Sequence, residues 1–459
     1  MNVNPITRLD YPDPDVIRVE DTYYMVSTTM HFMPGCEILQ SFDLVHWEHV
    51  TYVYETLDHT DAQQLKSGQN IYGQGMWAAS LRYHEGRFCI CFVANDTRKT
   101  YLYTSEKIDG PWKKQLIEGF YHDGSLLFDE DGRNYIVYGN DEIWITELNE
   151  DLTAPKKDGL HRLLVSDHKN PELGYEGSHI QKINGYYYIF LIHSLRDRWM
   201  RTEACFYSDS LEGEFTGGDV LCDDRGYCGQ GVAQGGIVDT PDGKWYAMLF
   251  QDSGAVGRIP ILLPVTWKDH FPFFGQNGHV PEEIEVHSTR PGYIYQPLVG
   301  SDDFCNGLLP RWQFNHDPDP RYYHLDALQG TYTITTREVC TELTQAVNTL
   351  TQRMSYPSCA AEVTVDASAL KEGDVAGLCA LQSCYAAVGI TKHHGKYEVL
   401  MLDKKEDGIL DMTEGTVVES HQMDFRLEAD FCNMKDEARC YYRVNKGDWL
   451  PIGTEHKLY

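Results

Sequence analysis

One unit recurs five times in the first part of the chain, and it constrains the fold more than any other feature. Each copy is a short strand, a tight turn and a second strand that opens with an aromatic side chain, and the head residue stands eight positions before the turn. The copies are YPDPDVIRVEDTYYMVSTT, WAASLRYHEGRFCICF, DGSLLFDEDGRNYIVYG, EGSHIQKINGYYYIFL and QGGIVDTPDGKWYAMLF. Repeats built of short strands and tight turns are typical of a β-propeller, in which each repeat forms one blade. We therefore predict five blades.

The head residues of the five copies predict where a functional site lies. They are Asp13, Trp77, Asp123, Glu176 and Gln234. Because blades are related by rotation about one axis, equivalent positions form a ring around the central pit. Three carboxyl groups in that ring repel one another and are costly to desolvate, which chemistry explains better than stability does.

The repeat stops near RPGYIYQPLVGS, at residues 290–301, and we place the domain boundary there. Residues 1–297 are the predicted propeller. Residues 298–459 alternate apolar and polar positions, as in CAAEVTVDAS and ARCYYRVNKG, which predicts antiparallel strands and a β-sandwich. The expected fold is therefore all-β.

Composition restricts the classes of partner. The formal net charge of −30 argues against nucleic acid and anionic membranes and fits a neutral substrate, while 30 tyrosines suit the faces of sugars. No Cys/His set has zinc spacing, so no metal site is predicted. The first motif begins close to Met1 and no apolar run approaches membrane length, so we expect a cytoplasmic protein, or a secreted one if a leader was removed.

Longer stretches resemble a known family. NPITRLDYPDPDVIRVEDTYYMVSTT, MWAASLRYHEGRF, DGSLLFDEDGRNYIVYG, YEGSHIQKINGYYY and AVGRIPILLPVTW resemble glycoside hydrolase family 43, in its β-xylosidase and α-L-arabinofuranosidase branch. SDDFCNGLLPRWQFNHDPD, NTLTQR and KEGDVAGLCALQ resemble the concanavalin-like sandwich that follows the propeller in that branch. The resemblance implies an inverting exo-glycosidase that acts on terminal β-D-xylosyl or α-L-arabinofuranosyl residues of neutral pentose-containing oligosaccharides.

The resemblance also implies roles for individual residues. Asp13, in PDPD, matches the general base, and Glu176, in EGSH, matches the general acid. Asp123, before GSL, matches the acid that tunes its partner's pKa and holds the sugar. Trp77 and Arg258 match sugar-binding positions. With inversion, the acid protonates the leaving oxygen while the base activates water on the opposite face.

Three positions in the predicted pocket depart from the family pattern. Gln234 stands where many relatives have a histidine that can hold calcium, so no cofactor is expected to be required and a structural calcium ion is not favoured. His122 replaces a frequent aromatic residue, and Met30 replaces a frequent phenylalanine. The last two changes bear on which sugar is preferred, and we include all three residues among the expected substrate-binding positions.

Several alternatives stay open at the sequence level. A non-catalytic sugar-binding propeller would not need all three acids, and a retaining fructan hydrolase would carry Asn-Asp-Pro and Arg-Asp-Pro motifs that are missing here. An endo-acting arabinanase is a further alternative. Neither the preference between xylose and arabinose nor the oligomeric state follows from the sequence.

The sandwich is expected to be incomplete at its C-terminus. In the resembling branch it continues for several strands beyond the position of WLPIGTEHKLY, and a late segment brings an aromatic side chain to the rim of the pocket. An unfinished sandwich would expose a strand edge, and a pocket lacking one wall would hold sugar less tightly.

Overall fold

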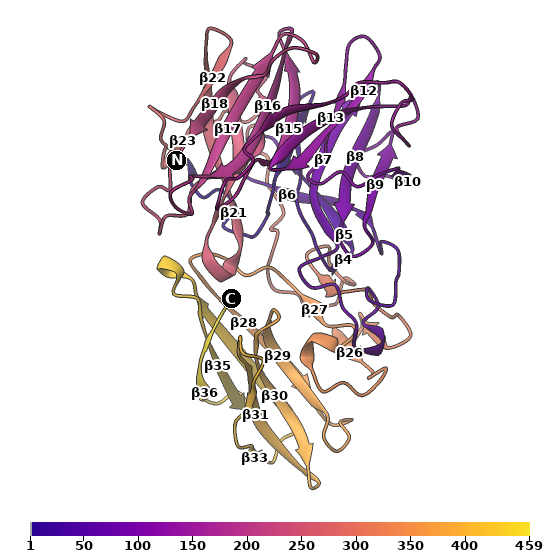
Figure 1. The fold of residues 1–459 in the computed structure, drawn as a ribbon. Coiled ribbons are helices and arrows are strands. Elements are labelled where there is room, and N and C mark those ends of the chain that lie inside the picture. Colours follow the sequence, from indigo (N-terminus) through magenta and orange to yellow (C-terminus); the bar gives the residue numbers. More distant parts are fainter. Residues whose placement is uncertain (1) are drawn as a thin grey trace. The chain divides into compact units, whose positions relative to one another are not determined.

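The computed structural model describes residues 2–459, which form two compact units (Figure 1). The first unit takes in the chain up to Asp252 together with Arg258–Arg353, and the second takes in Ser253–Gly257 and Met354–Tyr459. Nearly all regular structure is strand, as predicted, and the helices are single 3₁₀ turns. None of the helices in residues 2–459 is long and apolar enough to cross a membrane.

The first unit contains five antiparallel sheets of four strands each. Blade one is β2 (Asp15–Val19), β3 (Thr22–Val26), β5 (Gly35–Ser41) and β6 (Glu48–Tyr54). Blade two is β7 (Met76–His84), β8 (Arg87–Ala94), β9 (Lys99–Ser105) and β10 (Lys113–Ile117). Blade three is β11 (Ser125–Phe128), β12 (Asn134–Asn140), β13 (Glu142–Leu148) and β14 (His161–Ser166). Blade four is β15 (Glu176–Ile183), β16 (Tyr186–Ser194), β17 (Arg201–Ser208) and β18 (Thr216–Leu221). Blade five is β19 (Ala233–Asp239), β20 (Trp245–Asp252), β21 (Arg258–Lys268) and β22 (Phe271–Phe274).

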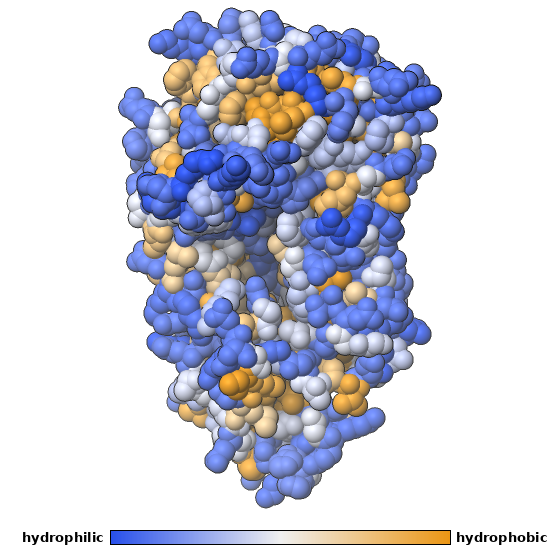
Figure 2. Space-filling model, viewed as in Figure 1, coloured by the Kyte–Doolittle hydropathy of each residue, from blue (hydrophilic) through white to orange (hydrophobic). Residues whose placement is uncertain are grey.

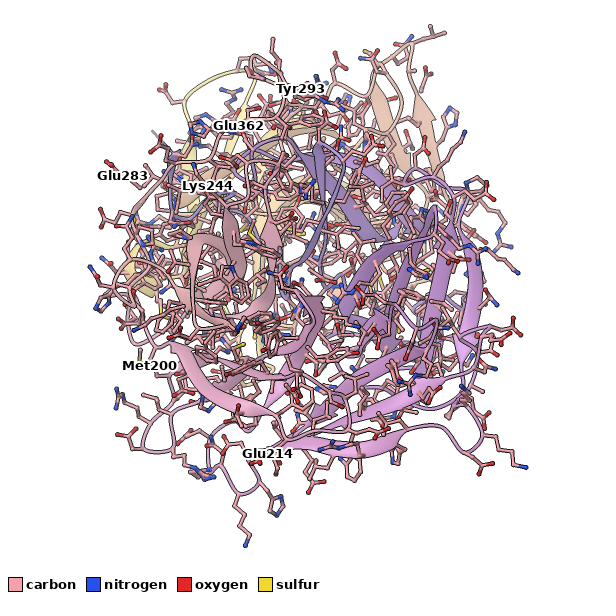
Figure 3. The ribbon with its side chains drawn as sticks, turned by 90° about the horizontal axis from the view of Figure 1, so that it is seen from above. Met200, Glu214, Lys244, Glu283, Tyr293 and Glu362 are labelled. Atoms are coloured by element: carbon pink, nitrogen blue, oxygen red, sulfur yellow. The ribbon has the colours of Figure 1, made fainter. Side chains whose placement is uncertain are left out.

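The first strands of the five sheets close into a ring. β2 contacts β7, β7 contacts β11, β11 contacts β15, β15 contacts β19, and β19 returns to β2. Seen from above, the blades spread outward from this ring, and Glu214, in the turn before β18, lies at the periphery (Figure 3). This arrangement confirms the predicted five-bladed propeller.

The tight turns that the repeat predicted join the first two strands of the blades. Glu85 and Gly86 have φ of 48° and 78°, and Asn184 and Gly185 have φ of 52° and 86°. Two consecutive positive φ values are those of a type I′ hairpin, whose twist matches that of the strands, and they favour glycine and asparagine. The head-to-turn spacing thus reflects inner strands of similar length.

The faces between blades are apolar and tightly buried. Val26 and Ile38 of blade one pack with Leu81, Ile90 and Phe92 of blade two, and each is at most 1% exposed. Alternating residues of each strand supply these contacts, because side chains of a strand point to opposite faces. Burial between rigid sheets fixes the inner strands, and therefore their head residues, in place.

Residues beyond 297 continue to pack on the propeller as far as Arg353. β24 (Gln313–Asn315) pairs with β4 (Phe32–Met33) on one side and with β27 (Leu350–Thr351) on the other. β25 (Tyr323–Asp326) and β26 (Thr331–Ile334) form a hairpin in the same segment. Near the start of the chain, β1 (Asn2–Val3) pairs with β23 (Glu283–Ile284).

The second unit is a sandwich of two antiparallel sheets. One sheet is β28 (Ser358–Asp366), β34 (Gln422–Asp430), β35 (Glu437–Val444) and β36 (Leu450–Lys457). The other is β29 (Val375–Leu381), β30 (Tyr385–His393), β31 (Lys396–Lys404), β32 (Leu410–Met412) and β33 (Thr416–Val418). The sheets face each other, since β29 and β30 contact β34, and buried Val388, Ile390 and Phe425 lie in the core. This confirms the predicted β-sandwich.

The face of the molecule in Figure 2 is mainly hydrophilic, and its hydrophobic patches are small and separate. That surface agrees with the strong net negative charge of the chain. Small scattered apolar patches are normal for a soluble surface and mark no docking site by themselves.

Candidate active site

The head residues are placed by irregularities at the start of the inner strands. In three blades the pairing with the second strand slips by one residue, between Met76 and Ala79, Glu176 and His179, and Ala233 and Gly236. Such bulges redirect side chains and are common next to active sites. Trp77, Glu176 and Gln234 lie at these bulges, and Asp13 and Asp123 each lie two residues before an inner strand begins.

Three of the five head residues have a strained backbone. Asp13, Asp123 and Gln234 have φ of 53°, 47° and 60°, in the left-handed region that glycine tolerates best. A left-handed residue with a side chain costs about 1–2 kcal/mol. Strain of this kind gathers at functional sites, where the surrounding structure holds it in place.

Asp13 is a buried carboxylate held on both of its oxygens. It is 6% exposed. Thr28 Oγ1 donates to its Oδ2 at 2.5 Å, and Arg258 Nη1 lies 2.9 Å from its Oδ1. These two contacts fix the orientation of the carboxylate. Arg258 was expected to bind sugar, and in the structure it pairs with Asp13.

The loop that carries Asp13 is anchored from the far end of the first unit. Asp10 Oδ1 accepts a hydrogen bond from the backbone N–H of Arg258 at 2.7 Å. Arg353 Nε donates to the Asp10 carbonyl oxygen at 2.8 Å, and its guanidinium lies 4.3 Å from the centre of the Tyr11 ring. The other end of that guanidinium pairs with the buried Glu37 at 2.9 Å. Residues distant in sequence therefore fix the loop.

Asp123 and Glu176 lie close together with His122 between them. His122 Nε2 is 3.6 Å from Asp123 Oδ2 and 3.4 Å from Glu176 Oε2. The backbone N–H of Gly177 donates to Asp123 Oδ2 at 3.1 Å, and Asn140 Nδ2 donates to Glu176 Oε2 at 2.7 Å. Asp123 is 6% exposed, whereas the side chain of Glu176 is 21% exposed. The two carboxyl groups therefore differ in access to solvent.

The charges in this cluster shift its titration. Burial raises the pKa of Asp123 to about 7, and the negative charges of Glu176 and Asp13 add to the rise while His122 opposes it. Burial lowers the pKa of His122, but Asp123 and Glu176 outweigh that effect and raise it to about 9. The site therefore holds one carboxyl group, Asp123, whose protonation changes near neutral pH, as groups at functional sites often do.

The other predicted positions surround the acids to different degrees. The Trp77 ring meets the His122 ring edge-on at 5.8 Å, and the buried indole Nε1 has no hydrogen-bond partner among residues 2–459. The Gln234 side chain lies against Gly177, where an added Cβ would approach it to 2.8 Å. Met30 forms a backbone bridge with Met76, the residue before Trp77. This bridge ties Met30 to the strand that carries Trp77.

Sequence reasoning missed three polar residues of this region. Asn140 holds Glu176, as described above. Arg201 is close to Asp252, as Arg258 is, and burial together with the charge of Arg258 lowers the pKa of Arg201 to about 10. Glu203 is fully buried, and its Oε2 accepts a hydrogen bond from the backbone N–H of Gln234 at 2.7 Å. These residues lie on second and third strands of their blades, outside the repeat register.

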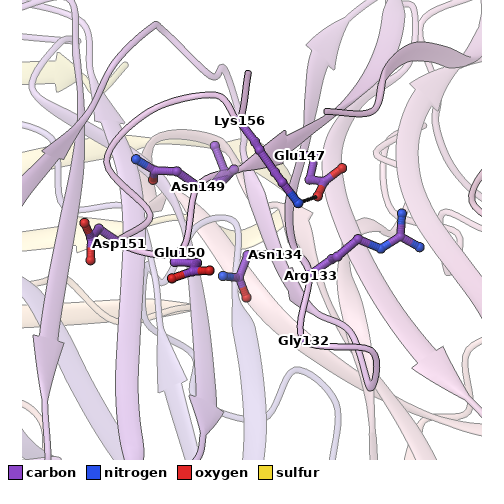
Figure 4. A pocket seen from close by; sticks show the side chains of 9 residues that line it. Gly132, Arg133, Asn134, Glu147, Asn149, Glu150, Asp151 and Lys156 are labelled. Carbon is purple, nitrogen blue, oxygen red and sulfur yellow. Dashed lines mark hydrogen bonds and ion pairs between the residues drawn. The ribbon is translucent and has the colours of Figure 1, made fainter. Parts of the chain in front are cut away.

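A separate hollow of about 390 Å³ lies at the other end of blade three (Figure 4). It is lined by Asn134 and Leu148, which pair at the end of β12 and β13 opposite to Asn140. Its one charged pair is Lys156 with Glu147, at 2.6 Å. Six residues of strand separate it from the acids, roughly 20 Å. This hollow is therefore distinct from the candidate site.

The arrangement supplies the parts that acid–base catalysis requires. One carboxylate is paired with arginine and hydroxyl donors, while a second carboxyl group is partly exposed beside a third whose pKa is raised. Groups in surroundings this different can hold different protonation states at one pH.

Known proteins are similar to this chain along most of its length. The chain matches the profile of Glycosyl hydrolases family 43 over residues 3–272 and that of the Beta xylosidase C-terminal Concanavalin A-like domain over residues 301–458. A β-xylosidase of Formosa agariphila is 27% identical over 87% of this chain and 76% of its own length. A non-reducing end α-L-arabinofuranosidase of Bacteroides ovatus is 24% identical over 89% of this chain and 79% of its own length.

A solved structure is more similar still. A bifunctional protein of Bacteroides eggerthii, described as GH43-CE, is 41% identical and superposes with a TM-score of 0.92 over 99% of this chain. This chain spans 59% of that protein.

Proposed function

Because this chain belongs to glycoside hydrolase family 43, we propose that it removes terminal β-D-xylosyl or α-L-arabinofuranosyl residues, with inversion, from neutral pentose-containing oligosaccharides. The names of the relatives support both sugars, since one is a β-xylosidase and another an α-L-arabinofuranosidase. The observation that carries the proposal is the contrast between Asp13, fixed by Arg258, and Glu176, which is partly exposed beside Asp123.

In the proposed mechanism Asp13 is the general base. Its carboxylate takes a proton from a water molecule, which attacks the anomeric carbon on the face opposite the leaving group. Arg258 and Thr28 each donate a hydrogen bond to that carboxylate and so orient it. The strained backbone at Asp13 adds to this fixed orientation.

Glu176 is the proposed general acid, and Asp123 its modulator. Glu176 donates its proton to the glycosidic oxygen as the bond breaks. Asp123 lies beside Glu176, across His122 Nε2, and with the sugar bound it forms hydrogen bonds with the sugar's hydroxyl groups. Trp77 and His122 line the position of the terminal sugar, and Trp77 Nε1, which has no partner in the described residues, would donate to a hydroxyl group.

The role of Glu176 is tested with two substrates that differ in leaving group. For Glu176→Gln we expect hydrolysis of xylobiose to fall by about 10²–10⁴-fold, because the sugar leaving group needs a proton. Hydrolysis of 4-nitrophenyl β-D-xyloside should fall much less, since nitrophenolate leaves without protonation. Steady-state kinetics on both substrates measure the difference, and equal losses would exclude Glu176 as the acid.

The stereochemical course separates this proposal from a retaining mechanism. NMR of the anomeric protons during early turnover should show product with the configuration opposite to that of the substrate. Turnover should be unchanged by EDTA, because the proposed steps use carboxyl groups alone. Product of unchanged configuration would overturn the inverting assignment.

A further inference from the structure

His122 lies between two carboxyl groups, an arrangement that also suits the binding of a metal ion. Its Nε2 is 3.4 Å from Glu176 Oε2 and 3.6 Å from Asp123 Oδ2, and the three atoms all lie within 4.8 Å of one another. These separations are long for charge-assisted hydrogen bonds, which are about 2.7–2.9 Å. They match the spacing of about 3.4 Å between ligand atoms around a tetrahedral zinc ion with bonds near 2.0–2.2 Å.

The donor set also fits such an ion. One imidazole and two carboxylates are ligands that zinc and similar divalent transition metals accept, and three protein ligands leave one position open. Both carboxylates are already oriented by neighbours, Asp123 by the Gly177 N–H and Glu176 by Asn140. Outer contacts of this kind hold metal ligands in place and raise affinity. The spacing rules used on the sequence could not find this set, because His122 and Glu176 are 54 positions apart.

We propose that a divalent transition metal ion, represented by Zn²⁺, binds to His122, Asp123 and Glu176 and inhibits hydrolysis. The inhibition rests on the function proposed above, because a Glu176 carboxylate bound to zinc has lost the proton that the leaving oxygen requires. Zinc binds only an unprotonated imidazole nitrogen and carboxylate oxygens, so binding releases to solvent both the proton of the His122 imidazolium and that of the Glu176 carboxyl group. His122 supplies the only nitrogen ligand of the set, so the imidazole decides between zinc and the oxygen-seeking ions Ca²⁺ and Mg²⁺.

Binding is tested directly, without reference to activity. A second group that could hold a metal, Glu372 with His393 and His394, is exposed on the sandwich and must be removed first. We therefore use the full chain carrying His393→Ala and His394→Ala, and titrate it with ZnCl₂ in a calorimeter in a buffer that does not bind zinc. One site is expected. His122→Phe in that background should weaken it by at least about tenfold.

A matched variant controls for the loss of a histidine. The side chain of His84 is 40% exposed and stacks on Phe128 at 4.6 Å, at the end of β7 opposite to Trp77. His84→Phe should leave the zinc affinity unchanged. Unchanged affinity in His122→Phe, with the fold intact by circular dichroism, would overturn the proposal.

Inhibition is the second readout. ZnCl₂ should reduce hydrolysis of 4-nitrophenyl β-D-xyloside, EDTA should restore it, and CaCl₂ or MgCl₂ at the same concentration should have no effect. In His122→Phe the zinc concentration for half-inhibition, relative to that variant's own rate, should rise at least about tenfold. Zinc bound through His122 without inhibition would overturn the inhibitory half of the proposal. If no glycoside is hydrolysed, the proposed function fails while calorimetry still decides the zinc site.

Discussion

Two groups of charged residues, one within the inner strands and one at or just before their starts, differ in how fully their charges are compensated. In the first group Asp15 is fully buried and completely partnered: Arg82 lies at 2.7 Å, His179 at 3.1 Å and the Leu81 N–H at 2.7 Å. Burial alone would raise the pKa of Asp15, but Arg82 and His179 hold it below its ordinary value. Arg82 also donates to Ser125 and so links three blades.

In the second group the acids are left with fewer partners. Asp123 has one backbone donor and a long contact to His122, and its pKa rises to about 7. Asp13, two residues from Asp15, has left-handed backbone, while Asp15 begins a regular strand. Buried charges that are fully paired, as at Asp15, suit a structural role. Acids with fewer partners, as at Asp123, can change their charge during a reaction.

The largest effect is expected in the second group, for the rate. Asp13→Asn removes the only carboxylate proposed to activate water while keeping the side chain's shape. The amide oxygen can still accept from Arg258, whereas the amide nitrogen cannot accept from Thr28. We expect kcat/KM to fall by about 10²–10⁴-fold on both xyloside and arabinofuranoside. The matched change Asp21→Asn removes an exposed carboxylate paired with Arg290 and should leave kcat/KM unchanged. Near-normal activity of Asp13→Asn would move the base elsewhere.

The next effect is expected in the first group, for stability. Asp15→Asn leaves the Arg82 guanidinium buried without its charge partner, so the free energy of unfolding should fall by about 3–5 kcal/mol. Urea denaturation measures this. Asp21→Asn is the reference for this loss, because it breaks a surface ion pair and such pairs contribute about 0–1 kcal/mol. A loss at Asp15 no larger than that at Asp21 would show that the first group is not structural.

A smaller effect, with a defined pH dependence, is expected at Glu203. Burial raises the pKa of this carboxyl group well above its ordinary value, and the hydrogen bond from the Gln234 N–H opposes the rise. The folded state therefore keeps a proton that the unfolded state loses above about pH 4.5, and the wild-type chain loses stability as pH rises from there. Glu203→Gln cannot lose that proton, so it should be more stable at pH 7 by roughly 1–2 kcal/mol.

Glu147, whose pKa is shifted in the opposite direction, provides the control. Burial raises the pKa of Glu147, but Lys156 and the Leu160 N–H hold it below its ordinary value. Its stabilisation is present above the unfolded pKa and is lost as pH falls, so Glu147→Gln should be destabilising at pH 7 and nearly neutral in acid. Thermal melts of both variants from pH 4 to pH 8 measure the two slopes. Parallel slopes would contradict the assignment at Glu203.

Much of the fold and the three acids of the site could be predicted from the sequence, because short-range patterns along the chain indicate them. Head-to-turn spacing reports the length of an inner strand, and equal lengths bring the heads into one ring. Asp13, Asp123 and Glu176 were predicted in this way, and the structure places their charges close enough to interact. The blade count and the sandwich were predicted from the same alternation and turns.

The residues that escaped prediction are those placed by long-range packing. Arg201 and Glu203 stand on the third strand of blade four, and Asn140 ends the second strand of blade three. None has a signature in its own neighbourhood, because a strand residue faces the site only through the register of its partners. The bulges at Glu176 and Gln234 shift that register by one residue, which spacing alone does not reveal.

The contacts of Arg353 limit where the C-terminal domain can be exchanged by recombination. By sequence profile the second domain begins at residue 301, yet by contact the chain belongs to the propeller unit as far as Arg353, whose side chain holds the loop before Asp13. A recombination event that exchanged the C-terminal domain at the profile boundary would also replace β24 and Arg353. The C-terminal domain therefore cannot be exchanged freely at that boundary. Its replacement must supply a strand that pairs with β4 and a cation that pairs with Glu37.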